Sequence, residues 1–204
     1  MSRSPADGHR HHLLALLRGN AVLWECLERV AELDLPDWYL GAGCVTQTVW
    51  NAAHGKPPGE DIDDHDLVYF DAGDLGEEAE DAVVTGAQEA VTGLPIRLDV
   101  KNQARVHLWY WQRFGYGIEP YRSTEAAIRT WPTTATAVGV RLTGGDPVVF
   151  APFGLADLFG LVVRANRVQV TPAIYQGKVA RWRRFWPDLT VLPWDDGIGA
   201  PRRA

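Results

Sequence analysis

Four aspartates stand close together in the stretch GEDIDDHDLVYFD, which spans residues 59–71. Two of them, Asp64 and Asp66, directly precede an apolar run at 67–70 that is typical of a buried strand. Because side chains alternate along a strand, Asp64 and Asp66 share one face and lie next to each other. Adjacent carboxylates repel unless a cation joins them, and hard oxygen ligands suit Mg²⁺. The spacing therefore predicts a magnesium site where this strand begins.

A third carboxylate, Asp99, lies inside a second strand-like run at 94–101. A carboxylate placed among apolar neighbours is costly unless it has a partner. If the sheet sets this strand beside the first, three carboxylates surround one or two ions. Aspartates before a strand often belong only to a turn, and we interpret Asp61 and Asp63 in that way because they lie in a Pro/Gly-rich loop at 54–63.

A glycine-rich turn precedes these strands in LGAGCVTQTVWN, residues 40–51. Small residues at the start of a helix expose backbone N–H groups and the positive end of the helix dipole, which suits a phosphate. Many strand–helix turns need glycine for steric reasons alone, so the turn by itself is weak support. The phosphate-binding candidates are Gly41, Ala42, Gly43, Thr46 and, as a further hydroxyl, Thr48.

Polar residues follow the third aspartate in KNQARVHLWYWQRFG, residues 101–115. We expect Arg105 to contact phosphate, with Gln103 and His107 as accessory residues. The alternative is a partly buried helix whose polar face caps neighbouring loops. His65 points away from the two aspartates beside it in a regular strand, so we expect it to be structural.

Basic and aromatic residues alternate near the C-terminus in KVARWRRFW, residues 178–186. Such a segment can hold single-stranded nucleic acid. More often, a helix of this kind packs its aromatic side chains inward and leaves its arginines in solvent.

Helices and strands must alternate to position these residues. We expect one domain over residues 9–190, a disordered N-terminus at 1–8 and an irregular tail at 191–204. The first predicted helix region is 9–32, which Gly19-Asn20 divides into two helices. Further helices are predicted at 44–53, 102–113, 153–163 and 171–186, the last with Pro172 in its first turn. Asp74 is expected to cap a helix that runs to about 91, and Ser123 is expected to cap a short helix. The predicted strands are 38–40, 64–70, 94–101, 138–142 and 148–151, the last two joined as a hairpin at Thr143–Asp146.

The composition sets limits on the class of protein. The 204 residues carry a net charge of −6, which argues against a protein that binds nucleic acid over its whole surface. Two cysteines give no disulfide framework and favour a reducing compartment. No apolar run approaches the ~20 residues of a membrane span, so we expect a cytoplasmic protein without membrane contact. The sequence leaves the oligomeric state open.

The order of these motifs resembles the nucleotidyltransferase fold of the DNA polymerase beta superfamily, and more closely its bacterial nucleotidyltransferase-like proteins. The stretches that carry the resemblance are GAGCVTQTVWN, DDHDLVYFD, LDVKNQARVHLWY and APFGLADLF with the RAN after it, spread over residues 38–166. The stretch HGKPP is also similar to a loop of tRNA-terminal nucleotidyltransferases. The resemblance implies an α/β (α+β) fold: a short mixed sheet flanked by helices, with helical N- and C-terminal additions.

The resemblance also implies roles for single residues. Asp64 and Asp66 would bind two Mg²⁺ or Mn²⁺ ions, and Asp99 would hold the catalytic metal and help to deprotonate the acceptor. Ala42-Gly43 stand where the superfamily has a Gly-Gly or Gly-Ser pair that holds the triphosphate. The chain departs from this pattern, because alanine replaces the first glycine and Cys44 follows the second.

The function expected from the resemblance is transfer of a nucleoside monophosphate from an NTP to an acceptor hydroxyl, with release of pyrophosphate. The acceptor is left open among a small molecule, a protein side chain and RNA. The alternative is a non-catalytic nucleotidyltransferase-like protein that binds a nucleotide or a partner through the same cleft.

Overall fold

A computed structural model describes residues 5–200, with side chains from residue 7 onward. Its helices are α1 (Pro5–Gly19), α2 (Ala21–Ala31), α3 (Gly43–Ala53), α4 (Glu77–Ala90), α5 (Val106–Phe114), α6 (Thr124–Ile128), α7 (Ala156–Phe159) and α8 (Pro172–Phe185), with a 3-10 turn η1 (Trp194–Asp196). Its strands are β1 (Tyr39–Gly41), β2 (His65–Tyr69), β3 (Leu98–Asn102), β4 (Gly139–Thr143), β5 (Asp146–Phe150), β6 (Val162–Val163) and β7 (Thr190–Val191).

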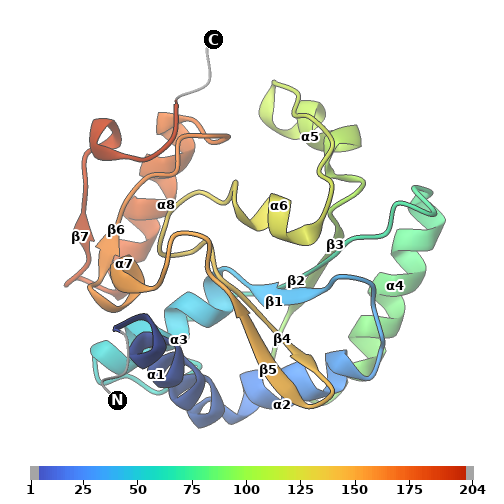
Figure 1. The fold of residues 1–204 in the computed structure, drawn as a ribbon, viewed down its shortest axis with the longest axis horizontal. Coiled ribbons are helices and arrows are strands. Elements are labelled where there is room, and N and C mark those ends of the chain that lie inside the picture. The colour runs from blue at the N-terminus through green and yellow to red at the C-terminus, as the bar shows by residue number, and fades with distance from the viewer. Residues whose placement is uncertain (1–4, 201–204) are drawn as a thin grey trace.

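A five-stranded mixed sheet forms the centre of the molecule, in the order β3-β2-β1-β4-β5 (Figure 1). Strands β2 and β3 run parallel, joined by the crossover helix α4, whereas the β1–β2, β1–β4 and β4–β5 pairs are antiparallel. The predicted short mixed sheet is therefore confirmed, including the hairpin that extends it.

The two faces of the sheet differ in what covers them. Leu40, Leu67 and Val140 belong to the main core, together with buried residues of α1, α2 and α3. On the opposite face, Tyr39 and Val68 pack against Ile128 at the end of α6. Figure 1 shows α5, α6 and α8 on this second side of the sheet. The alternation of side chains along β2 thus places the aspartates on the face that looks toward α5, α6 and α8.

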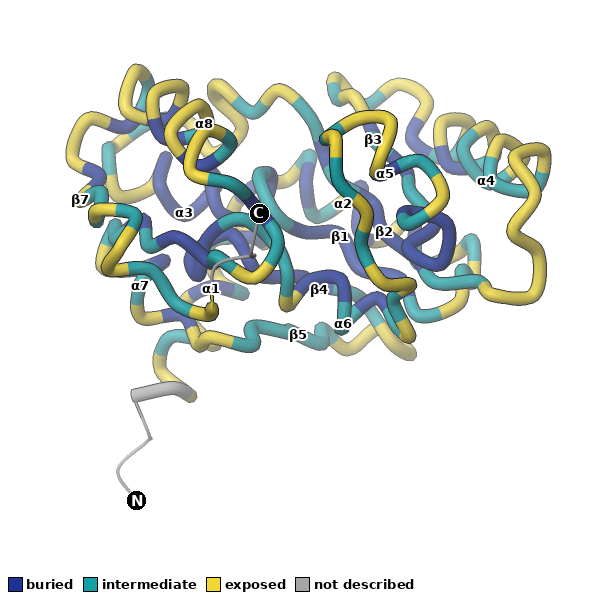
Figure 2. The backbone as a smooth tube through the Cα atoms, turned by 90° about the horizontal axis from the view of Figure 1, so that it is seen from above, coloured by how far each residue is buried: buried dark blue, intermediate teal, exposed yellow. Residues whose placement is uncertain are grey.

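Burial follows the same plan. Figure 2 shows buried backbone along β1, β2 and α3, with exposed segments on the outer turns of α4 and α8. Cys26 and Cys44 are buried and free. In residues 5–200 there is no helix with the length and apolar character needed to cross a membrane.

Several predicted boundaries are confirmed by their capping groups. Asn20 separates α1 from α2, and its side chain accepts a hydrogen bond from the Leu23 backbone. Ser123 and Thr171 cap α6 and α8 in the same way, and Pro172 lies in the first turn of α8.

Other predicted boundaries are wrong for identifiable reasons. The helix expected over 153–163 is reduced to α7, because Gly154 and Leu161 have positive φ angles of 72° and 54° that no α-helix contains. Asp74 does not cap α4; its carboxylate accepts from the Gly76 backbone, and the helix begins only at Glu77.

The turn between β3 and α5 is set by a buried asparagine. The side-chain oxygen of Asn102 accepts from the Asp71 and Ala104 backbones at 3.0 Å, and its amide donates to the Asp71 carbonyl at 2.8 Å. Strand β3 therefore continues to Asn102, and α5 begins at Val106 rather than at 102.

The chain ends also differ from expectation. Residues 5–8, expected to be disordered, lie in α1, while residues 1–4 and 201–204 lie outside the described part. The tail after 190 contains β7 and the 3-10 turn η1, and it packs against the domain. Strand β7 pairs with β6, and Ile198 forms a bridge with Asn166.

Candidate active site

Two aspartates from different strands lie side by side at the edge of the sheet. In the parallel β2–β3 pair, Asp66 and Asp99 are direct partners, followed by Leu67 with Val100 and Val68 with Lys101. Paired residues of neighbouring strands project from the same face, so both carboxylates point toward α5, α6 and α8. This juxtaposition was expected from the two aspartate-containing strands.

The Asp66 carboxylate sits in an environment that disfavours its charged form. Burial raises its pKa to about 7, and the carboxylates of Asp64 and Asp99 act in the same direction. Lys178 and a hydrogen bond from the Gly43 backbone N–H act against this rise. A nearby positive charge would favour the ionised carboxylate.

The other two expected metal ligands have cationic partners of their own. Asp64 accepts from Arg97 at 3.0 Å, and Asp99 accepts from Lys101 at 2.8 Å. Within residues 5–200, no group of three or more His, Cys, Asp or Glu side chains is arranged to hold a metal ion. The residues nevertheless fit a divalent cation chemically, because they supply oxygen donors and because like charges contribute to the raised pKa of Asp66. Rotation of Asp64 and Asp99 away from their cations would complete the set.

A cleft of about 380 Å³ opens over the aspartate pair. Strands β2 and β3 form the floor of this cleft, and the turn after β1 closes one end. The walls are formed by α5, α8 and the segments 121–132 and 169–170. Its lining residues are Ala42, Asp66, Val68, Asp99, Lys101, Gln103, Val106, Trp109, Tyr110, Arg113, Phe114, Tyr121, Thr130, Trp131, Pro132, Gln169, Val170, Ile174 and Lys178.

Two basic side chains line the cleft, and they come from helices that are distant in sequence. Arg113 belongs to α5 and Lys178 to α8. Burial and the nearby Arg181 lower the pKa of Lys178, while Asp66 and Asp64 raise it, so its ammonium lies within the field of the aspartates. Sequence reasoning missed both residues as site candidates, although the basic run at 178–186 carried the signal for Lys178.

Aromatic side chains form much of the remaining wall. Trp109 and Tyr110 stack with ring centroids 6.1 Å apart, and Tyr110 packs on Phe114 at 4.4 Å. The cleft thus combines carboxylates, cations and flat apolar surface, which are the groups that metal ions, phosphates and nucleobases contact.

The glycine turn contributes backbone rather than hydroxyl groups. Ala42 lines the cleft, and the Gly43 N–H reaches Asp66. Gly41 is required by packing, because a Cβ there would lie 2.5 Å from the Val138 carbonyl oxygen.

The two threonines of this turn do not face the cleft. The hydroxyls of Thr46 and Thr48 are buried and donate to the Ala135 and Cys44 carbonyls. Of the phosphate-binding residues expected in this turn, only Ala42 lines the cleft, and Gly41, Gly43, Thr46 and Thr48 lie outside its lining.

The polar residues after Asp99 separate into two groups. Gln103 lines the cleft. Arg105 instead forms an ion pair with Glu80 of α4 and donates to the Leu75 carbonyl at 2.9 Å, so the structure does not bring it to the aspartates. His107 is not among the cleft residues.

The remaining polar residues of the aspartate-rich stretch lie away from the cleft. His65 is buried on the core face of β2, and burial lowers its pKa to about 4. Asp61 pairs with Lys56 at 2.6 Å, and Asp63 lies 3.6 Å from Arg181. Both aspartates belong to the loop before β2, as expected.

The sheet carries aspartates in register on two parallel strands, and the turn at the start of α3 contacts one of them. This arrangement is typical of the nucleotidyltransferase fold. A family model described as Nucleotidyltransferase matches residues 28–191, and the chain belongs to that family. The expected fold and superfamily are confirmed by this match and by a solved structure.

That solved structure is described in the words "The NMR structure of the protein reveals a CCA-adding enzyme head domain". It superposes with a TM-score of 0.70 and 25% sequence identity, covering 89% of this chain and 95% of that one. The similarity therefore extends over most of the chain. No protein of curated function matches the sequence.

Proposed function

We propose that this protein is a metal-dependent enzyme that transfers a nucleoside monophosphate from an NTP to an acceptor hydroxyl. The observation that carries the proposal is the Asp66–Asp99 pair, set in register on the floor of a cleft that also contains Lys178 and Arg113. Family membership supports the reaction class. The similar structure, described as a CCA-adding enzyme head domain, supports a nucleotide as the group that is transferred.

Asp66, together with Asp64 after release from Arg97 and Asp99 after release from Lys101, would hold Mg²⁺ or Mn²⁺. Divalent ions bound there would stabilise negative charge on the attacking and leaving oxygens. The chain's own residues supply the rest of the site. Lys178 and Arg113, which line the cleft, would bind phosphate oxygens, and the aromatic wall of α5 would contact the base.

The proposed reaction is an in-line displacement at the α-phosphorus. The acceptor oxygen forms a bond to this phosphorus, while the bond from it to the bridging oxygen of the β-phosphate breaks. Pyrophosphate leaves with the electron pair of that bond, and the hydroxyl proton passes to the Asp99 carboxylate. Lys101, which lies 2.8 Å from Asp99, would hold this carboxylate only until the metal ion binds.

A binding protein without turnover is the second candidate. The observation that favours it is that Asp64 and Asp99 are each engaged by a cation of the chain, Arg97 and Lys101. In such a protein the cleft would hold a nucleotide while these ion pairs stayed closed.

Transfer of label separates the two functions. The protein is incubated with each NTP labelled at the α-phosphate, with Mg²⁺ or Mn²⁺ and a cell extract as the source of acceptor. We expect labelled product from the wild type and from Asp63→Asn, whose carboxylate lies in the loop, and none from Asp66→Asn. Nucleotide binding without any labelled product would identify the binding protein. Equal transfer by Asp66→Asn and the wild type would refute the proposed site.

A further inference from the structure

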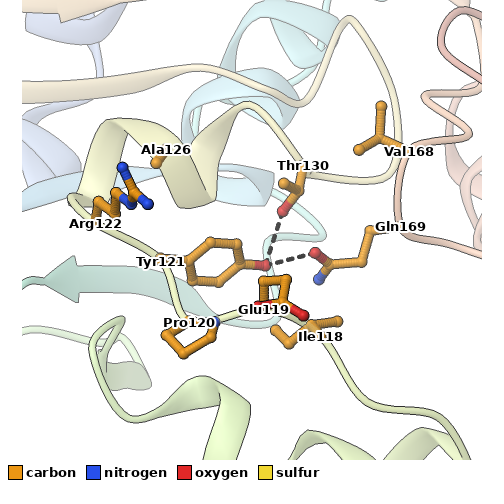
Figure 3. A pocket seen from close by; sticks show the side chains of 9 residues that line it. All are labelled: Ile118, Glu119, Pro120, Tyr121, Arg122, Ala126, Thr130, Val168 and Gln169. Atoms are coloured by element: carbon orange, nitrogen blue, oxygen red, sulfur yellow. Dashed lines mark hydrogen bonds between the residues drawn. The ribbon is translucent and has the colours of Figure 1, made fainter.

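A second cavity, of about 480 Å³, adjoins the cleft (Figure 3). It is built by the loop before α6, by α6 with its C-terminal end, and by the segment before α8. Its lining residues are Ile118, Glu119, Pro120, Tyr121, Arg122, Ala126, Thr130, Val168 and Gln169. Three of them, Tyr121, Thr130 and Gln169, also line the cleft over the aspartates. The two cavities therefore share a wall.

The shared wall is a set of hydrogen-bonded side chains. The Tyr121 hydroxyl lies 2.9 Å from the Thr130 hydroxyl and donates to the side-chain oxygen of Gln169 at 2.7 Å (Figure 3). The Gln169 side chain also hydrogen-bonds to Tyr110 of the cleft wall. The Gln169 side-chain oxygen accepts from Tyr121, and the amide NH₂ of the same side chain provides two protons that can bind an occupant. The wall thus offers hydrogen-bonding groups at the point where the cavities meet.

The outer part of the second cavity is lined by apolar side chains and by two charged ones. Ile118, Pro120 and Val168 provide the apolar surface, and Val168 is 47% exposed. Arg122 and Glu119 are exposed on the rim, and within residues 7–200 neither forms an ion pair. Cavities of roughly 300–1,000 Å³ with apolar walls and a few polar groups are typical of small-molecule sites.

We propose that this second cavity binds the acceptor, and that the acceptor is a small hydroxylated organic anion. Its anionic group, a carboxylate or a phosphate, pairs with Arg122, and its apolar body lies against Ile118 and Val168. Its hydroxyl meets the shared wall at Gln169 and faces the cleft. This inference rests on the proposed function, and it selects the small molecule among the three acceptors that the sequence left open.

The reason for assigning the acceptor here is the adjacency that transfer requires. The two reactants must meet at a common boundary, and their remaining parts need separate space. The second cavity shares a wall with the cleft and contains none of Asp66, Asp99 and Lys178. Its size and its apolar lining suit a compact molecule better than a polynucleotide, and the net charge of −6 agrees with that choice.

Nuclear magnetic resonance tests the site without requiring turnover. Isotope-labelled protein, saturated with Mg²⁺ and a non-hydrolysable NTP analogue, is titrated with two ultrafiltration fractions of a cell extract: the small-molecule filtrate and the retained macromolecules. Hydroxy carboxylic acids and sugar phosphates are then titrated separately to distinguish the two anions. We expect the filtrate to shift the Gln169 side-chain NH₂ and the Arg122 resonances. Shifts caused only by the retained fraction, which contains RNA and protein, or no shifts at all, would overturn the proposal.

Two substitutions connect binding with transfer. Arg122→Gln removes the anion partner, and Ala126→Leu fills the cavity at a position that does not line the cleft. Because a hydrogen bond to a charged group is lost, Arg122→Gln should slow transfer to the filtrate about tenfold or more while NTP binding stays unchanged. Arg184→Gln, an exposed arginine of α8, is the matched control and should transfer at the wild-type rate.

The outcomes distinguish the two hypotheses. If Asp66→Asn transfers as well as the wild type, the proposed function fails, whatever the resonances at Gln169 show. If the wild type labels an acceptor and Arg122→Gln with Ala126→Leu leaves that transfer unchanged, the acceptor does not bind in the second cavity. Filtrate molecules that bind at Gln169 but never receive label would likewise exclude this cavity as the acceptor site.

Discussion

At position 42 the chain carries an alanine in a backbone conformation that glycine adopts at less cost. The φ and ψ angles of Ala42 are 52° and −119°, in a region that a Cβ atom disfavours. This residue both precedes the first turn of α3 and lines the cleft. The superfamily pattern described above has glycine here, so the departure from the pattern is also a site of local strain.

Replacement of Ala42 by glycine should relieve that strain. We expect Ala42→Gly to raise the free energy of unfolding by about 1 kcal/mol, since a strained conformation costs more than the added flexibility of glycine in the unfolded chain. Urea denaturation measures the change. Ala52→Gly, at an exposed helical position of α3, is the matched control and should lower stability by about 1 kcal/mol. A less stable Ala42→Gly protein would show that the turn is not strained.

At the scale of elements, the exit from β3 decides where α5 stands and therefore where the aromatic wall of the cleft lies. Asn102 holds this exit through bonds to the backbone of Asp71 and Ala104, and it is only 2% exposed. Its removal leaves buried backbone groups without partners, which is more costly than the loss of an exposed hydrogen bond.

We expect Asn102→Ala to lower the free energy of unfolding by about 3 kcal/mol. Gln103→Ala is a suitable control, because the Gln103 side chain makes a single long bond of 3.3 Å to the Lys101 carbonyl. Circular dichroism during urea denaturation should show the larger loss at position 102 only. Similar stability of the two variants would mean that the Asn102 bonds do not hold the turn.

At the scale of the whole molecule, the buried His65 and the partly buried Asp66, on opposite faces of β2, give stability opposite dependences on pH. The pKa of His65 is lowered to about 4, so its contribution is present above the unfolded value of 6.5 and is lost as pH falls. The pKa of Asp66 is raised to about 7, so the folded state is favoured while this carboxyl is protonated. That contribution is lost as pH rises from 3.8 through 7.

The comparison of Asp66→Asn with the wild type isolates the second effect, because both proteins contain His65. In EDTA, the variant should match the wild type near pH 4 and exceed its free energy of unfolding at pH 8. The expected gain is about 2 kcal/mol, a value reduced for solvent screening of this partly exposed side chain. Urea denaturation across that pH range measures it. A variant that is less stable than the wild type at pH 8 would contradict the assigned environment of Asp66.

How far the sequence predicts the molecule depends on the range of the interactions involved. Alternation along β2 placed Asp64 and Asp66 on one face and His65 on the other. The Gly19-Asn20 break, the Ser123 cap and Pro172 located the starts of α2, α6 and α8. These effects act within a few residues. The turn at Asn102 and the break after α7 were missed, since their causes are backbone angles and distant partners.

The site shows the same limit. The proximity of Asp66 and Asp99 could be predicted from two strands of one kind. The position of Lys178 in the cleft could not be predicted, because this residue comes from a helix that lies far beyond Asp66 along the chain. Arg105 was expected at the phosphates from its closeness in sequence to Asp99, yet Glu80 of α4 engages it. Only the assembled fold decides which cations face the carboxylates.

The parallel pairing of β2 with β3 has a consequence for how this chain can vary between relatives. The crossover that contains α4 can gain or lose residues without moving Asp99, provided that the two strands keep their alignment. A single residue inserted within β3 before Asp99 would instead turn that carboxylate to the core face. Relatives that keep the site should therefore differ in length between Tyr69 and Leu98, and not inside the strands themselves.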